Sequence, residues 1–174
     1  IINAVNFPAF LYTKKILFKL DENKTTGTKD IISYDKAAST IYRSIYNNIT
    51  RKEQKVIKKI VKKIGILDSM TQEQKIFEIE NYLKNNYNII DISDNEYENL
   101  YKIYKNNIAN NHGITKLFAN LFNYYNINHN LVITSNRTKF KFDPEFESYL
   151  FLNQYLFYFP ETKKYLIPDK FAFR

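Results

Sequence analysis

The chain contains no cysteine, and this absence removes several classes of protein at once. Disulfide scaffolds, zinc sites built on thiolates and enzymes with a cysteine nucleophile all need a residue that this sequence lacks. The sequence therefore excludes thiol chemistry of every kind.

Glycine, histidine and long apolar runs are also scarce. The three glycines are too few for a dinucleotide-binding or phosphate-binding glycine motif. The two histidines, His112 and His129, are not part of a spaced ligand set of the kind that holds a metal ion. No apolar run approaches the roughly 20 residues that a membrane-spanning helix needs. The sequence therefore predicts no cofactor, no metal and no membrane span.

Apolar residues are nevertheless abundant enough for a packed core, at 44% of the 174 residues. Positive charge is also abundant: the net charge is +8, and residues 51–64 carry seven basic residues against one acid, Glu53. A face of this kind can bind phosphates. A solvated helix face explains the same charges more simply, so nucleic acid is not the expected partner, and a basic nucleic-acid-binding helical domain is the alternative.

The periodicity of apolar residues predicts helices first and strands afterwards, which is the pattern of an α+β domain with a small antiparallel sheet. Thr50 and Glu53 have the spacing of a capping box, and Gly65 is a helix stop. Residues 88–96 are predicted to form a loop, and residues 9–20 a strand or strand pair. The predicted helices cover residues 33 to about 47, 51–64, 71–87, 97–107 and 113–125, and the predicted strands 131–135, 153–159 and 164–168.

The order of these segments resembles that of bacterial transglutaminase-like domains. The helix TQEQKIFEIENYLKNNY (71–87) is similar to the helix before the active site of that family. ANNHGIT (109–115), with the apolar helix and strand after it, resembles the nucleophile segment. FLNQYLFYFPETKKYLIPD (151–169) resembles the hairpin that carries the catalytic base and its carboxylate. The resemblance covers roughly residues 70–170 and implies a papain-like arrangement, in which the nucleophile helix packs against an antiparallel sheet.

The catalytic residues of that family are missing. Asn111 stands at the cysteine position without gaps, and Ile114 would stand there in a gapped register. Gln154 replaces the histidine, and Pro168-Asp169 inverts the family's Asp-Pro. Neither Asn nor Gln can act as the nucleophile or the base of acyl transfer. His112 points about 100° away from its neighbour on a helix and is not expected to substitute as base. The resemblance thus implies a degenerate cleft lined by Asn111, His112, Gln154 and Asp169.

This resemblance implies a catalytically inactive transglutaminase-like domain that serves as a binding or structural module of a larger bacterial protein. Residues 66–174 would form its core, and residues 1–65 a lead-in segment of a strand and two helices packed on that core or linking to it. The implied partners are other domains of the same protein and a peptide or glycan. The implied location is the periplasm or cell envelope, with the cytoplasm as the alternative.

An enzyme is the other hypothesis. Asp143, Glu147 and Asp169, with Arg137 nearby, could form a replaced acidic site of a hydrolase, because paired carboxylates perform acid–base work. The site requires these side chains to converge. A turn that begins at Asp143-Pro144 explains both of these residues without a substrate, with the acids solvated.

Overall fold

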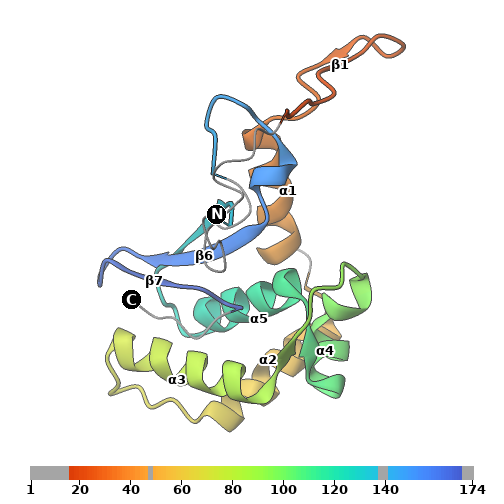
Figure 1. Cartoon of the computed structure of the whole chain (residues 1–174). Helices are drawn as coiled ribbons and strands as arrows, with labels where there is room; N and C mark the ends of the chain where they lie inside the picture. The colour runs from red at the N-terminus through yellow and green to blue at the C-terminus, as the bar shows by residue number, and fades with distance from the viewer. Residues whose placement is uncertain (1–15, 47–48, 137–140, 170–174) are drawn as a thin grey trace, which may run out of the picture.

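The computed structural model describes residues 16–46, 49–136 and 141–169, and it has the expected α+β architecture (Figure 1). Two short 3-10 helices, η2 (Asn95–Tyr97) and η3 (Tyr149–Phe151), accompany the α-helices. The α-helices are α1 (Tyr34–Tyr46), α2 (Arg51–Ile64), α3 (Gln72–Asn86), α4 (Leu100–Asn106) and α5 (Asn111–Tyr124). No helix of the described residues is long and apolar enough to cross a bilayer.

The main sheet contains three antiparallel strands in the order β5-β6-β7. They are β5 (Asn130–Thr134), β6 (Gln154–Phe159) and β7 (Lys164–Leu166). The turn between β6 and β7 ends at Lys163, which has a positive φ of 55°. The prediction of helices followed by a small antiparallel sheet with a terminal hairpin is therefore confirmed.

Two further strand pairs were not predicted. β1 (Glu22–Asn23) pairs antiparallel with β2 (Thr28–Lys29), and β3 (Asn88–Ile89) pairs parallel with β4 (Ile108–Ala109). The prediction of a loop over 88–96 is thus wrong at its start, because a two-residue strand has no periodicity to recognise and its partner lies far along the chain.

Two other boundaries differ from the expectation. Residues 16–20 are not in a strand, and the rest of the predicted 9–20 strand lies outside the described residues. The helix predicted over 97–107 begins as α4 at Leu100, because the Asn99 side chain accepts hydrogen bonds from the backbone N–H groups of Tyr101 and Lys102. An asparagine that satisfies free backbone donors in this way sets the start of a helix.

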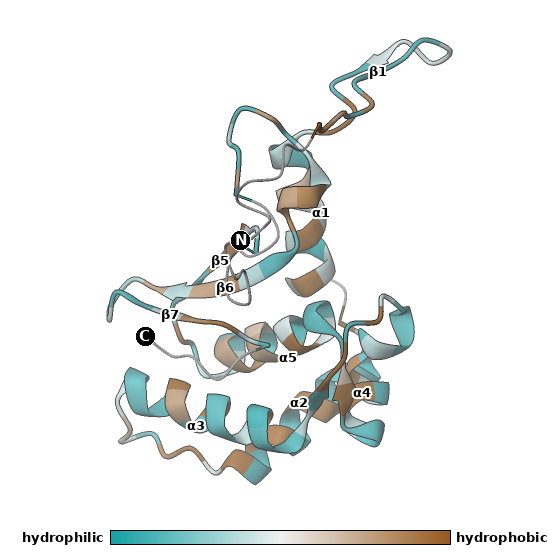
Figure 2. Ribbon diagram, viewed as in Figure 1, coloured by the Kyte–Doolittle hydropathy of each residue, from teal (hydrophilic) through white to brown (hydrophobic). Residues whose placement is uncertain are grey.

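Helix α5 lies in the middle of the molecule, between the sheet on one side and α2 and α3 on the other (Figure 1). Figure 2 shows brown, apolar residues on α5 and on the neighbouring strands β6 and β7. Phe122 packs edge-on against Phe157 and Phe159 of β6, with ring centroids 5.1 and 5.3 Å apart. Such edge-to-face packing stabilises aromatic pairs beyond the burial of their area. The core therefore forms around α5.

Helices α1 and α2 contribute to the same core as the later elements. Ile45 of α1 and Ile60 of α2 are fully buried in one cluster with Leu83 of α3 and Phe118 of α5. The helices of the predicted lead-in segment are thus packed directly on those of the predicted core.

The predicted capping box of α2 is present, and it does more than cap the helix. Thr50 accepts from the Glu53 N–H, and Glu53 Oε2 accepts from the Thr50 backbone at 2.9 Å. Glu53 is only 2% exposed. Its other oxygen accepts from the N–H of Leu100 at 3.0 Å and lies 3.3 Å from Lys116 Nζ, so one carboxylate joins α2, α4 and α5.

Burial by itself raises the pKa of the Glu53 carboxyl, but the hydrogen bonds from the Thr50 and Leu100 backbones and the Thr50 hydroxyl, with the charge of Lys116, lower it overall. The side chain is therefore charged at neutral pH. A buried carboxylate that is paired and hydrogen-bonded in this way holds the elements together. Losing any one of its partners would leave part of a buried charge unsatisfied, which destabilises the fold.

Candidate functional site

The residues aligned with the family's catalytic positions come from three elements. Asn111 is the first residue of α5, Gln154 is the first residue of β6, and Asp169 follows β7. An antiparallel hairpin places the start of its first strand beside the end of its second. Gln154 and Asp169 meet for this reason, and Gln154 Nε2 donates to Asp169 Oδ1 at 3.0 Å.

The structure brings Asn111, Gln154 and Asp169 to one pocket of about 370 Å³. Ile114, the alternative nucleophile position, is fully buried in the apolar core instead. Asn111, which the ungapped alignment places at the nucleophile position, therefore lines a cavity, whereas Ile114 of the gapped alignment does not. The rest of the pocket wall consists of Ile89, Ile90, Asp91, Asn136 and Asn153.

The pocket is lined by side-chain amides and carboxylates, and one acceptor in it is unpaired. Asn111 Nδ2 donates to the Asn153 carbonyl over a long 3.4 Å, while Asn111 Oδ1 is buried without a hydrogen-bond partner among the described residues. Burying an acceptor without a donor costs about 1–3 kcal/mol. A ligand with hydroxyl or N–H donors would satisfy this oxygen.

A buried lysine lies near the acidic end of the pocket. Lys84 of α3 forms an ion pair with Glu80 one turn earlier, and both side chains are buried. Burial lowers the pKa of Lys84, whereas the charges of Glu80 and Asp169 raise it. Asp169 is therefore electrostatically linked to α3, which sequence reasoning missed because α3 carries no motif at this position.

His112 lines a second pocket, of about 270 Å³, that shares Asn111 and Asn153 with the first. Its Nε2 lies 2.8 Å from Ser44 Oγ, and its Nδ1 lies 3.3 Å from Glu98 Oε2. Burial lowers the pKa of His112, and Glu98 opposes that shift. The ring is therefore held between α1 and the segment before α4.

The row Ser44, His112, Glu98 has the residue types of a hydrolytic triad, but its geometry is that of a structural contact. The Ser44 hydroxyl lies 2.7 Å from the carbonyl of Ile41, to which it can donate, and Ser44 lines neither pocket. A nucleophile needs an open path to a substrate. Ser44 and Glu98 carry no sequence signal that links them to His112.

The start of α5 is packed against backbone. The Asn110 side chain accepts from the Gly113 N–H at 2.8 Å and so caps the helix. A Cβ on Gly113 would lie 2.0 Å from the carbonyl oxygen of Tyr97. Only glycine allows this close approach, and the approach places the 95–99 segment beside the second pocket.

The pocket at the start of α5 contains only one acid of the alternative hydrolase site, Asp169, among the residues described. Asp143 Oδ1 accepts from the backbone N–H groups of Glu145 and Phe146, as the predicted turn requires. Glu147 Oε1 accepts from the N–H of Tyr34 at the start of α1, 3.0 Å away. The pocket that contains Asp169 includes neither, and Arg137 lies outside the described residues.

His129 also has a structural environment. Its Nδ1 lies 2.8 Å from the Ile127 carbonyl, and its Nε2 lies 3.0 Å from the Tyr46 hydroxyl. Burial lowers the pKa of His129. The neutral ring can therefore donate to the carbonyl and accept from Tyr46, whose pKa is raised by burial.

Comparisons of the chain with protein-family models, with curated proteins and with solved structures found no match. The transglutaminase-like assignment consequently stays a prediction. It depends on the resemblance in segment order and on the pocket described above.

Proposed function

We propose that the chain is a catalytically inactive transglutaminase-like domain that binds a ligand in the pocket between the start of α5 and the β6–β7 hairpin. One observation carries the proposal: Asn111, Gln154 and Asp169, aligned with nucleophile, base and carboxylate, line the same pocket. The hairpin itself brings Gln154 and Asp169 together, whereas Asn111 comes from a distant part of the chain and joins them through tertiary packing.

The chemistry of the three residues supports binding without turnover. Cysteine-type acyl transfer needs a thiolate, a base within hydrogen-bond reach and a group that orients the base. Asn111 offers an amide, and Gln154 donates to Asp169 without being able to take up a proton at neutral pH. A concave site with a few polar groups still binds a ligand when its reactive atoms are gone.

The polar groups of the pocket favour a ligand that is rich in donors. Asp91 and Asp169 contribute carboxylates, Asn111 contributes an unpaired carbonyl oxygen, and the described residues of the pocket wall include no lysine or arginine. Glycan hydroxyls or the amides and amino groups of a peptide match these acceptors. In this proposal the domain works beside other domains of a larger bacterial envelope protein.

The experiment that tests the proposal rebuilds the missing dyad. Asn111→Cys combined with Gln154→His would place a thiol and an imidazole in the pocket, with Asp169 beside the imidazole. Because the chain has no other cysteine, alkylation by iodoacetamide reports on this thiol alone. A neighbouring imidazolium lowers the pKa of a thiol. We expect alkylation at pH 6 at least about tenfold faster than in Asn111→Cys alone.

Two controls make the result specific. Asp169→Asn added to the double variant should reduce the acceleration, because the imidazole loses its orienting carboxylate. Ile114→Cys with Gln154→His should react slowly, because Ile114 is fully buried. Equal alkylation rates with and without Gln154→His would show that the two positions do not face each other and would overturn the proposal.

A further inference from the structure

Helices α2 and α4 lie side by side (Figure 1). Together they carry the lysines and tyrosines of a second polar surface. The Nζ atoms of Lys59 and Lys63 lie 5.7 and 4.9 Å from the ring centroid of Tyr104 on α4. Sequence reasoning recognised only the charge of α2, because α4 becomes its neighbour through tertiary packing. The basic face is defined here as Lys52, Lys59, Lys63, Tyr101, Lys102, Tyr104 and Lys105.

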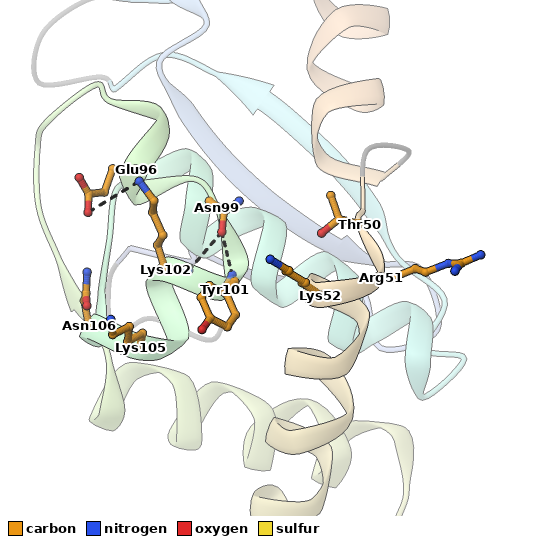
Figure 3. Close-up of a pocket in the computed structure, with 9 residues that line it drawn as sticks. All are labelled: Thr50, Arg51, Lys52, Glu96, Asn99, Tyr101, Lys102, Lys105 and Asn106. Carbon is orange, nitrogen blue, oxygen red and sulfur yellow. Dashed lines mark hydrogen bonds and ion pairs between the residues drawn. The ribbon is translucent and has the colours of Figure 1, made fainter.

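The basic face is concave near the start of α2, where a pocket of about 690 Å³ separates the two helices. In Figure 3, Lys52 extends from α2 toward α4, whereas Arg51 points away. Lys102 lies 3.9 Å from Glu96, the acid in the pocket wall. Neither Lys52 nor Lys105 forms a salt bridge within the described part of the chain, so their charge is available to a ligand.

An exposed aromatic ring lies among these cations. Tyr101 is 49% exposed and lines the same pocket. Its backbone N–H is held by the Asn99 cap, which fixes the position from which the ring projects. A positively charged groove with an accessible aromatic ring is the combination that binds single-stranded nucleic acid, since phosphates pair with cations and bases stack on the ring.

We propose that the basic face binds the backbone of single-stranded nucleic acid, with Lys52, Lys102 and Lys105 at phosphates and Tyr101 stacked on a base. From Lys52 to Lys63 the face follows about 16 Å of α2, which exceeds the length of a single phosphate group. An unpaired base fits a concave pocket beside a ring, whereas the bases of a duplex are already stacked. The site shares no residue with the ligand pocket of the proposed function, so the two proposals stand or fall separately.

Fluorescence anisotropy with labelled 20-nucleotide poly(U) or oligo(dT) tests this proposal. Reversing three charges, with Lys52→Glu, Lys102→Glu and Lys105→Glu, should weaken binding at least about tenfold. It should also lower the slope of log affinity against log salt by about two, because each of the three phosphate contacts on a single strand contributes about 0.7. A matched variant, with Lys24→Glu, Lys29→Glu and Lys141→Glu, has the same net charge and reverses exposed lysines elsewhere. It should weaken binding by less than about threefold.

Variants of Tyr101 separate base stacking from general attraction to negative charge. Tyr101→Ser should weaken binding about fivefold or more, and Tyr101→Phe should restore it, because only the ring is needed for stacking. Circular dichroism and thermal melting confirm that each variant is folded. The proposal is overturned if the wild-type chain does not bind at low salt, if both triple variants lose affinity equally, or if Tyr101→Ser has no effect while anionic vesicles bind as tightly.

Discussion

The ligand pocket at the start of α5 and the basic face have opposite chemistry in one chain of net charge +8. The pocket wall consists of amides, carboxylates and two isoleucines, while the basic face presents five lysines. The basic face is built from two helices, α2 and α4, whereas the pocket is lined by residues from five separate stretches between Ile89 and Asp169. The net charge of the chain therefore predicts the chemistry of neither surface. Folding places the lysines on the basic face and the amide and carboxylate acceptors in the pocket.

The two regions also differ in how they are held together. Behind the basic face, Glu53 fastens three helices with a buried carboxylate whose oxygens are fully used. In the pocket, the Asn111 carbonyl oxygen is buried with no partner among the described residues. One region pairs its buried polar groups fully, and the other retains a buried acceptor that costs stability until a hydrogen-bond donor pairs with it.

The largest expected effect on stability comes from removing the Glu53 carboxylate that joins α2, α4 and α5. Glu53→Ala removes the buried ion pair with Lys116 and the acceptor of the Leu100 N–H, and we expect a loss of about 3–5 kcal/mol in the free energy of unfolding. Urea denaturation measures it. Glu73→Ala, which removes an exposed ion pair with Lys164 at the start of α3, is the matched control and should cost less than about 1 kcal/mol. Similar losses in both variants would contradict the role assigned to Glu53.

Gly113→Ala should give the next largest effect. The added methyl group would collide with the Tyr97 carbonyl, so the segment behind His112 and Glu98 must shift, at a cost of about 2–3 kcal/mol. Gly65→Ala is the control, because Gly65 has a φ of 68° but open space around it, and backbone strain alone costs about 1 kcal/mol. Thermal melting of both variants compares the cost of the steric collision at Gly113 with the cost of backbone strain at Gly65. A smaller loss at Gly113 than at Gly65 would contradict the packing described here.

Acid should destabilise the chain gradually. Burial lowers the pKa values of His112 and His129, so the unfolded chain binds protons at a higher pH than the folded chain does. Stability is therefore fully present above about pH 6.5, the ordinary value, and falls as the pH drops from there toward the folded pKa values. Urea denaturation at pH 7.5, 6.5 and 5.5 measures the slope. The double variant His112→Gln with His129→Gln should make the free energy of unfolding depend less on pH. An unchanged slope would mean that other groups cause the dependence on pH.

The smallest expected effect is at the pocket itself. Asn111→Leu removes the unpaired carbonyl oxygen, and we expect no loss of stability or a gain of up to about 1 kcal/mol. Asn110→Leu, one residue earlier, removes the cap of α5 and its hydrogen bond to the Ile92 carbonyl, and should cost about 1–2 kcal/mol. Thermal melting distinguishes the two variants. A clear loss from Asn111→Leu would mean that this side chain is structural.

The expected helices and the main sheet follow from short-range signals. The Thr50–Glu53 capping box and the glycine stop at Gly65 set the ends of α2 where the structure has them. Apolar spacing also predicts the helix over 113–125, which the structure has as α5. Signals of this kind act within a few residues, so one sequence is enough to recognise them.

Part of the candidate site was also accessible from sequence. The resemblance in segment order pointed to Asn111, Gln154 and Asp169, and the β6–β7 hairpin made the meeting of the last two predictable. Lys84 and Glu98 could not be found in this way. Each lies on a helix or turn with no motif. Glu98 lines the second pocket beside His112 through packing alone, and Lys84 is linked to Asp169 only by charge.

By itself, then, the sequence determined the order of the α-helices and of the main-sheet strands, most helix ends and the absence of thiol chemistry. Tertiary structure decided what no local pattern specifies: that Asn111 faces a pocket while Ile114 is buried, that Glu53 joins three helices, and that α4 completes the basic face. The physical reason is the distance along the chain over which each kind of interaction acts. Caps and apolar periods act between neighbours in sequence, whereas a pocket, a buried ion pair and a shared surface depend on which distant segments fold together.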